Sequence, residues 1–484
     1  MTVLIGGRSL TLEELVRVAR DREAVRLEPK AVERMARTRA VVERVLASGA
    51  PTYGLTTGVG VLKRIPLAGP AADAYAQRLI GQHRVGQGPA APDDVVRGTL
   101  AIQLNAFATG WPGVRPIVAE RIADRLNDGP TPTVRSLGSL GQADLAPLAD
   151  LAQAVIGGGD LAAGEGLALV TGNAFATASA ALAIVDLGTL VEVLEVAAAL
   201  SLEAIGANLS VLHPAVAGAR PHPGLATSLD MLRALLDGSS ARGDEAPRNL
   251  QDPLTFRTVA QVHGAVRDAI DHARSIVAVE LNASQGNPIV IEAEERVVSV
   301  ANFEIVGLAA ALDYQRIVLA TALSSAAERV VKLLETPWSG LPTGLAASTD
   351  PSDAGLAYLG IAVQAVAAEA RLLAAPVSYE LVSTAHAEGI EDRTTMAPLA
   401  ARRTAEMVGL GQRIAAAELA VASQAVELRG LAGLGLGTRA AFDEVRTSVP
   451  FTGPGELVPD VERLLGPIAA GAFDPVALLR TARP

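Results

Sequence analysis

Apolar residues recur at helical spacing along nearly the whole chain. One stripe is formed by Val259, Val262, Val266, Ile270, Ala273 and Val277. Steps of three or four residues of this kind are typical of a helix with one buried face. Longer helical patterns cover roughly 165–207, 304–336, 353–375 and 397–429. Sustained apolar–polar alternation is missing, and alanine is a poor strand former. The pattern predicts a mainly α fold with a central bundle of long helices.

Helix start and stop signals support this reading. Thr11 and Glu14 have the spacing of a capping box, in which each residue's side chain accepts a hydrogen bond from the other's backbone. An apolar stripe over 32–46 is followed by Gly49, a residue that commonly ends helices. Pro337, Pro351 and Pro376 punctuate the later helical patterns. We therefore expect the loops to be short and local.

Composition narrows the function classes. The 484 residues are 50% hydrophobic but only 19% charged, below the usual charged share of about 25%. This indicates large buried surfaces, including surfaces between subunits. The formal net charge of −11 argues against nucleic-acid binding, which needs a basic face. Cysteine is absent, which excludes disulfides, thiol catalysis and cysteine-based metal sites.

The N-terminal 50 residues show no signal-peptide pattern, so we expect a cytoplasmic protein. An uncharged stretch over 166–185 is long enough to span a bilayer. It is mostly alanine with polar residues inside it, and Asp186 follows directly. A buried helix of a large helical protein explains it better, and no membrane partner is expected.

The sequence gives little support for a metal site or for a site that binds a common cofactor. The six histidines lack metal-ligand spacing, and only three lysines are available for a Schiff base. Gly433, Gly435 and Gly437 resemble a dinucleotide-binding loop, but they follow a helical pattern and not a strand. We predict no metal.

Three loop segments carry candidate chemistry, in the order PTYGLTTGVG at 51–60, LGSLGQADLAPLAD at 137–150 and NLQDPLTFR at 249–257. Tyr53 can act as a general acid or base if a neighbouring charge lowers its pKa; a turn with an aromatic plug is the alternative. Asp144 precedes a helix whose N-terminus carries a partial positive charge; a simple N-cap is the alternative. Arg257 can bind a carboxylate through two hydrogen bonds, or it can pair with Asp252.

Taken together and in this order, the segments resemble the aromatic amino acid ammonia-lyase family, and most closely its histidine ammonia-lyases. Further blocks that carry the resemblance are QRLIGQH ending at His83, EGLALVTGN at 165–173, ELNASQGNP at 280–288, ANFE at 301–304, AAERVVKLL at 326–334 and GIEDRTTMAPLAARR at 389–403. The resemblance covers nearly the whole chain.

The resemblance implies a fumarase/aspartase-like fold, with a central bundle of long helices and a smaller N-terminal region. It divides the chain into 1–160, carrying the tyrosine loop and the signature loop, a bundle core over 161–430, and a C-terminal helical segment over 431–484. It also implies a homotetramer whose sites draw residues from three subunits. The family's electrophile is a methylidene-imidazolone (MIO), formed from an Ala-Ser-Gly tripeptide in the signature loop.

This chain departs from that tripeptide. It reads Gly141-Gln142-Ala143-Asp144 where the family reads Gly-Ala-Ser-Gly-Asp, so the loop is one residue shorter and the serine is gone. The exocyclic methylidene comes from loss of the serine hydroxyl, and Ala143 has no hydroxyl to lose. We therefore predict that no MIO forms and that the protein has no cofactor.

Other site positions are partly retained. Thr171 and Leu254 stand where the family has Asn and Tyr. The positions that match are Tyr53, Gly60, His83, Arg257, Phe303 and Glu391. Among them, His83 with Glu391 resembles the histidine-type pairing at the side-chain end of the pocket. We expect Tyr53, His83 and Glu391 to be catalytic, and Arg257, Gly60, Phe303, Thr171, Leu254 and Gln142 to contact the substrate.

These observations lead to a functional prediction. A base alone contributes on the order of 10²–10⁴-fold to a reaction, less than deamination needs without an electrophile. The prediction is an MIO-independent lyase-family enzyme in specialised metabolism that acts by acid–base chemistry on a small, pre-activated carboxylate. Elimination, conjugate addition, isomerisation and cyclisation all fit. The alternative is a catalytically silent scaffold or regulatory partner, and an ordinary histidine or aromatic amino acid ammonia-lyase is disfavoured.

Overall fold

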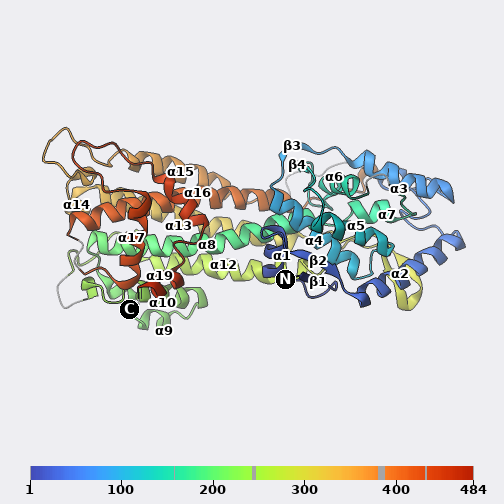
Figure 1. The fold of residues 1–484 in the computed structure, drawn as a ribbon, viewed down its shortest axis with the longest axis horizontal. Helices are drawn as coiled ribbons and strands as arrows, with labels where there is room; N and C mark the ends of the chain where they lie inside the picture. Colours follow the sequence, from blue (N-terminus) through green and yellow to red (C-terminus); the bar gives the residue numbers. More distant parts are fainter. Residues whose placement is uncertain (1, 157–158, 243–246, 380–386, 431–432, 483–484) are drawn as a thin grey trace. The chain divides into compact units, whose positions relative to one another are not determined.

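Helices dominate the structure, a computed structural model that describes all residues except 1, 157–158, 243–246, 380–386, 431–432 and 483–484 (Figure 1). Strands among the described residues are three or four residues long and pair into two-stranded sheets. The prediction of a mainly α fold with long helices is confirmed.

The longer helices are α2 (Pro29–Ser48), α3 (Pro70–His83), α4 (Asp93–Ala108), α5 (Pro116–Asn127), α6 (Leu145–Ile156), α8 (Ala174–Ile205), α10 (Pro223–Leu235), α12 (Val259–Glu280), α13 (Val306–Leu334), α15 (Leu359–Leu373), α16 (Ala397–Leu428) and α17 (Leu436–Ser448). The shorter α-helices are α1 (Leu12–Ala19), α7 (Glu165–Val170), α9 (Ala215–Ala219), α11 (Leu254–Arg257), α14 (Thr336–Ser339), α18 (Leu465–Ala469) and α19 (Pro475–Thr481). The strands are β1 (Thr2–Ile5), β2 (Ala24–Leu27), β3 (Gln87–Ala90), β4 (Arg135–Leu137), β5 (Ile289–Ile291) and β6 (Arg296–Val298).

The chain divides into two compact units, each assembled from separate stretches of sequence. Unit 1 comprises Met1–Ala183, Ala273–Leu312 and Pro376–Arg402. Unit 2 comprises Ile184–His272, Asp313–Ala375 and Arg403–Pro484. The division into 1–160, 161–430 and 431–484 stays a prediction.

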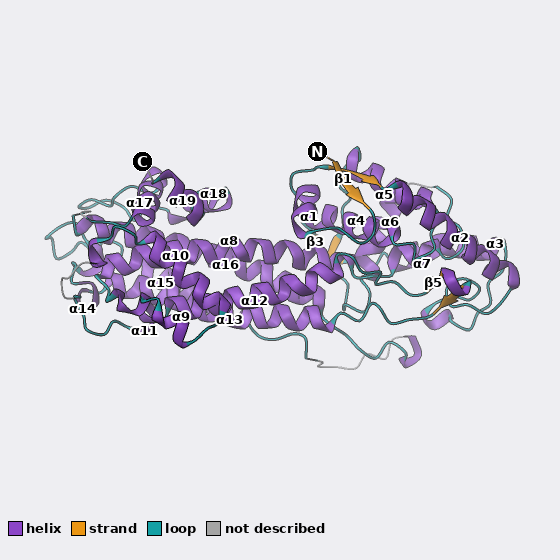
Figure 2. Cartoon of the chain, turned by 90° about the horizontal axis from the view of Figure 1, so that it is seen from below, coloured by secondary structure: helices purple, strands orange, loops and turns teal. Residues whose placement is uncertain are grey.

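Unit 2 contains a bundle in which α8, α12, α13 and α16 lie side by side, as Figures 1 and 2 both show. Buried ion pairs link the helices inside this apolar bundle. Arg329 of α13 pairs with Glu418 of α16 at 2.6 Å, and both side chains have no exposed surface. Arg267 of α12 pairs with the buried Glu195 of α8, also at 2.6 Å. The bundle thus fixes which helix faces meet by matched charges as well as by packing.

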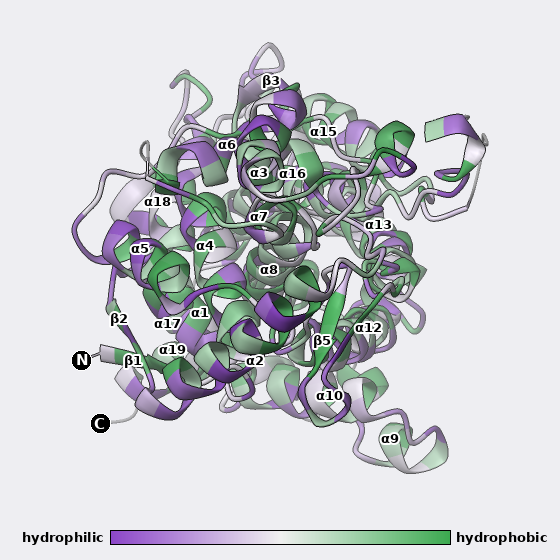
Figure 3. Ribbon diagram, turned by 90° about the vertical axis from the view of Figure 1, so that its right-hand side faces the viewer, coloured by the Kyte–Doolittle hydropathy of each residue, from purple (hydrophilic) through white to green (hydrophobic). Residues whose placement is uncertain are grey.

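Unit 1 contains the sheets together with the helices α1 to α7. Strands β1 and β2 pair in parallel, whereas β3–β4 and β5–β6 are antiparallel. The predicted capping box of α1 is present, since Thr11 accepts from the Glu14 backbone and Glu14 from the Thr11 backbone. Helix α2 ends at Gly49 in the left-handed conformation, as predicted. In Figure 3 the ribbon of α2 carries both hydrophilic and hydrophobic stretches, as expected of a helix with one buried face.

One predicted helix is interrupted. The apolar pattern over 165–207 forms α7 and α8, with a break at 171–173. Gly172 adopts a φ of +132°, and its carbonyl accepts a hydrogen bond from the Asp144 backbone at 2.7 Å. The pattern missed the break because apolar periodicity continues on both sides of it. The break places Thr171 at the wall of a large pocket described below.

The stretch over 166–185 covers α7 and the start of α8, and its alanines are buried in the protein. Within the described ranges, none of the helices combines the length and apolarity needed to cross a membrane.

Candidate functional site

A pocket of about 720 Å³ lies within unit 1 and gathers most of the predicted site residues. Its lining includes Tyr53, Gly60, His83, Gln142, Thr171, Phe303 and Glu391. These residues come from loops and helix ends spread over more than 300 positions of sequence. The pocket is large enough for an amino acid, because ligand sites commonly have volumes of about 300–1,000 Å³.

Tyr53 lies in the turn before Gly60, and its hydroxyl accepts a hydrogen bond from the Gly60 N–H at 3.1 Å. Burial raises the pKa of the Tyr53 phenol, and the nearby Glu391 charge adds to the rise against the effect of that hydrogen bond. The sequence set a pKa lowered by a neighbouring charge as the condition for Tyr53 to act as an acid or base, and the single chain does not meet this condition. Desolvation outweighs the one favourable dipole, so Tyr53 is a neutral phenol at pH 7.

Gly60 brings the tyrosine loop close to Glu391. It has a φ of +53°, a conformation that favours glycine. A Cβ built on Gly60 would lie 3.9 Å from Glu391 Oε1. The glycine therefore allows the loop backbone, the Tyr53 hydroxyl and the Glu391 carboxylate to share one end of the pocket.

His83 is the last residue of α3, and its Nδ1 lies 2.7 Å from the carbonyl oxygen of Leu79 one turn earlier. A carbonyl can only accept, so Nδ1 carries the proton. In the neutral ring Nε2 is then left as an acceptor. His83 and Glu391 both line the pocket, and both can accept a hydrogen bond from a substrate N–H.

The loop around Gln142 is held from several sides. The carbonyl of Gly141 accepts from Asn173 Nδ2 at 3.1 Å and from Thr395 Oγ1 at 2.8 Å. Gln142 Nε2 donates to Glu304 Oε2 at 2.7 Å. Ala143 is buried with a φ of +64°. The loop is therefore a defined structure, and its centre offers an amide and a methyl group but no hydroxyl.

Asp144 anchors the end of this loop. Its side chain is fully buried and accepts from the Ala176 N–H at 2.8 Å and from Ser139 Oγ at 2.8 Å. Burial raises the pKa of Asp144 to about 6, although these hydrogen bonds oppose the rise. The segment does start a helix, α6, as the sequence predicted.

Asp144 should make folding depend on pH. Because its pKa rises from 3.8 to about 6 on folding, the folded state binds the proton more tightly, and stability falls as pH increases through this interval. The maximum loss is about 3 kcal/mol, at about 1.4 kcal/mol per pKa unit. Asp144→Asn should remove this part of the slope in urea unfolding measured at intervals from pH 4 to pH 7. An equal slope in both proteins would contradict the assignment.

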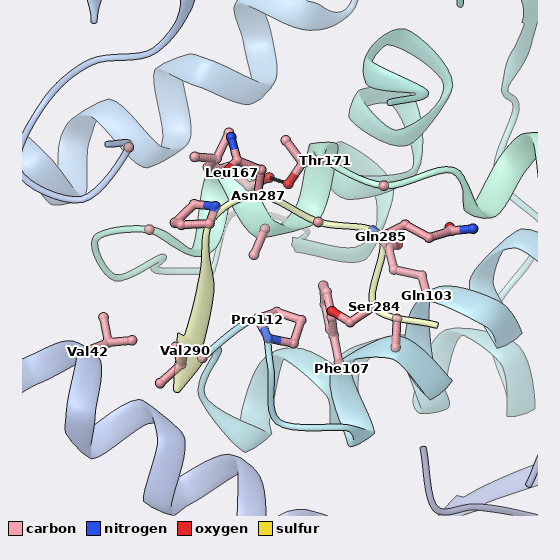
Figure 4. Close-up of a pocket in the computed structure, with 18 of the residues that line it drawn as sticks. Val42, Gln103, Phe107, Pro112, Leu167, Thr171, Ser284, Gln285, Asn287 and Val290 are labelled. Atoms are coloured by element: carbon pink, nitrogen blue, oxygen red, sulfur yellow. Dashed lines mark hydrogen bonds between the residues drawn. The ribbon is translucent and has the colours of Figure 1, made fainter. Parts of the chain in front are cut away.

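Thr171 separates the large pocket from a smaller cavity of about 40 Å³ (Figure 4). Leu167 and Asn287 also line both spaces. The Thr171 hydroxyl donates to the Leu167 carbonyl at 2.8 Å, so it can face the pocket only as an acceptor. The buried Ser284 hydroxyl beside the small cavity has no protein partner within the described ranges. A cavity of this size beside a hydroxyl without a protein partner is suited to an ordered water.

Arg257 and Leu254 are not part of this pocket. They form the two ends of the four-residue helix α11 in unit 2, and Leu254 is largely exposed. The carbonyl of Thr255 in the same helix accepts from the buried Arg329. Their predicted contacts with the substrate stay predictions.

Sequence reasoning missed several polar residues of the pocket, among them Glu304, Arg393 and Tyr75. Glu304 faces Gln142, and Arg393 lies 3.8 Å from Glu304. Tyr75 accepts a hydrogen bond from the Val59 N–H at 3.0 Å and so supports the tyrosine loop. Glu304 and Arg393 both belong to segments that carried the family resemblance. Their charge within those segments was the feature of the sequence that could have identified them as pocket residues. Among the residues that the structure describes, no group of three or more His, Asp or Glu could hold a metal.

Comparison with known proteins adds the family context. The family model described as aromatic amino acid lyase matches residues 10–163 and 159–447. The chain is similar to a histidine ammonia-lyase from Alkaliphilus metalliredigens, with 34% identity over 92% of each chain. Its fold is similar to a histidine ammonia-lyase from Trypanosoma cruzi, with a TM-score of 0.89 and 26% identity over 100% and 96% of the two chains. It is equally similar to an ergothioneine-degrading enzyme from Treponema denticola, with a TM-score of 0.89 and 26% identity over 100% and 99%.

Proposed function

The chain belongs to the aromatic amino acid lyase family, and from this premise we propose that it is a lyase that binds histidine and eliminates ammonia from it. The identity of the substrate is inferred from His83 and Glu391, which both line the pocket. With Nδ1 bonded to Leu79, His83 presents an acceptor nitrogen, and Glu391 presents a carboxylate. Each can accept a hydrogen bond from a ring N–H: a neutral imidazole offers one such donor and an imidazolium offers two.

This replaces the function predicted from the sequence. The prediction of an enzyme acting on a pre-activated carboxylate, with a silent scaffold as the alternative, is wrong; the absence of MIO is a separate statement and stays a proposal. Relatives that are 34–35% identical over 92–97% of this chain are named histidine ammonia-lyases. The prediction gave the altered loop more weight than the similarity of the entire remaining chain.

The proposed reaction breaks the Cβ–H and Cα–N bonds and forms a base–H bond and a carbon–carbon π bond. A base removes a proton from Cβ, and the C–H electron pair becomes the new carbon–carbon double bond. The Cα–N pair leaves with the nitrogen, so a protonated amine departs as neutral ammonia and the product is urocanate. Tyr53 is the proposed proton-transfer residue, His83 and Glu391 hold the imidazole, and Gly60 and Phe303 shape the pocket. Deprotonation of the neutral Tyr53 phenol must precede its action as a base.

The family's prosthetic group does not fit the loop of this chain. The exocyclic methylidene of that group needs a hydroxyl on the central residue, and Gln142 and Ala143 have none. Ser139 has a hydroxyl, but this residue precedes the Gly141 turn, and its hydroxyl donates a hydrogen bond to the Asp144 carboxylate. We therefore propose that no MIO forms here, and we assign no step of the reaction to that group.

We further propose a homotetramer and a cytoplasmic location. A second copy of the chain would bring Arg257 to the carboxylate end of the pocket, and Leu254 and Thr171 would complete its walls. The low charged fraction of 19% supports extensive subunit contact. Light scattering at micromolar concentration should give a mass close to four chains. A monomer under these conditions would contradict the assembly and leave the pocket without Arg257.

Incubation of the purified protein with L-histidine tests the proposed reaction. We expect urocanate and ammonia in equal amounts, and we expect Tyr53→Phe to reduce turnover on the order of 10²-fold while leaving the Kd of histidine nearly unchanged. Ergothioneine serves as the comparison substrate because a structural relative degrades it. Turnover of ergothioneine with none of histidine would overturn the proposal, as would histidine turnover that is unaffected by Tyr53→Phe.

A further inference from the structure

Glu304 brings a carboxylate to the pocket opposite the altered loop. Its backbone forms an antiparallel bridge with that of Gln142. Its side chain accepts from Gln142 Nε2 at 2.7 Å and from the Val306 N–H at 3.1 Å. The carboxylate is thus fixed by one bond on each oxygen, and both Glu304 and Gln142 line the pocket.

The Glu304 carboxylate retains acceptor capacity. A carboxylate has about four lone-pair positions, and the two hydrogen bonds occupy two of them. Arg393 Nε lies 3.8 Å away, but its side chain is 58% exposed and that of Glu304 is 33% exposed. Such an exposed pair is screened by solvent and contributes little. Glu304 therefore presents negative charge to the pocket, because its weak pair with Arg393 does not neutralise the carboxylate.

Gln142 adds a second acceptor beside this charge. Its Nε2 is used by Glu304, which leaves Oε1 directed to other donors, and within the described part of the chain none donates to it. A carboxylate and an amide oxygen together suit a primary ammonium group, which has three N–H donors. An anion would meet repulsion at the same place.

We infer that Glu304, assisted by Gln142 Oε1, binds the α-ammonium group of the substrate. The inference rests on the proposed function, because it places the amino group at the loop and the imidazole at His83 and Glu391. It assigns a substrate-binding role to Glu304 that the sequence did not suggest, and it gives Gln142 a function of its own. Such an ion pair strengthens binding and holds the amino group in place.

The test compares Glu304→Gln with the unaltered protein by calorimetric titration. The ligands are L-histidine and imidazolepropionate, which has the same ring and carboxylate but no amino group. Gln at position 304 keeps one acceptor oxygen, so it can still accept from either Gln142 Nε2 or the Val306 N–H. An unchanged thermal midpoint would verify that the loop remains in place. Glu294→Gln is the matched control, because Glu294 pairs with Arg296 in unit 1 and does not line the pocket.

We expect Glu304→Gln to raise the Kd of histidine on the order of tenfold, as for loss of a charged hydrogen bond. The Kd of imidazolepropionate should stay the same or fall, and Glu294→Gln should change neither. Equal weakening of both ligands, or no change for histidine, would overturn the inference while leaving the proposed function standing. Failure of the unaltered protein to bind histidine would overturn both.

Discussion

A variant in which Ala-Ser-Gly replaces Gln142-Ala143 is expected to lose two molecules of water from the new loop and to deaminate histidine at least on the order of 10²-fold faster than the unaltered chain. This factor is estimated from other enzymes. Removing one group that stabilises developing charge in the transition state typically lowers the rate about 10²–10³-fold. The unaltered chain should show its full sequence mass, because Ala143 has no hydroxyl to lose.

The structure supports this expectation through the surroundings of the loop. Asn173 and Thr395 donate to the Gly141 carbonyl, and Asp144 is held by Ser139 and Ala176. These contacts lie outside the two replaced residues and would hold the ends of the longer loop.

Intact-mass and peptide mass spectrometry measure the water loss, and urocanate absorbance measures the rate. Replacement by Ala-Ala-Gly is the matched control, since it has the same length but no hydroxyl, and it should gain neither the mass change nor the activity. Two waters missing from the unaltered loop would show that the absence of MIO was wrongly predicted. Dehydration of the Ala-Ser-Gly loop with no gain in rate would show that other altered positions, such as Thr171 and Leu254, limit the reaction.

Arg329→Met is expected to destabilise the fold by about 3–5 kcal/mol, because it leaves Glu418 buried without its cation. Both side chains have no exposed surface, and the guanidinium binds the carboxylate through Nε at 2.6 Å and Nη2 at 2.9 Å. Glu418 also accepts from Ser201 Oγ at 2.8 Å, but a hydroxyl cannot compensate for the lost charge.

Urea unfolding of three variants tests this estimate. The double variant Arg329→Met with Glu418→Leu should recover much of the loss, since an apolar pair of similar volume removes the buried charge altogether. Arg44→Met is the exposed control: its pair with Glu295 has side chains 55% and 67% exposed, and its loss should stay below about 1 kcal/mol. A small effect of Arg329→Met alone, equal to that of the control, would contradict the buried-pair argument.

Helix positions followed closely from the sequence. The pattern over 397–429 forms α16, and the stripe that begins at Val259 forms α12. Apolar periodicity and caps act between residues three or four positions apart, so they can be seen in the sequence itself. The break between α7 and α8 could not be seen in this way. It depends on a hydrogen bond between Asp144 and Gly172, which lie far apart in the chain.

The sequence by itself determined the mainly helical class, the family resemblance and the lack of a serine in the signature loop, because these depend on residue identity and local spacing. Folding, by contrast, brings Glu304 to Gln142, 162 positions away, and it places Arg257 in unit 2 whereas the pocket is lined by residues of unit 1. Folding also raises the pKa of Tyr53. Desolvation and charge at a site are summed over groups that folding brings together, and no local pattern in the sequence contains that sum.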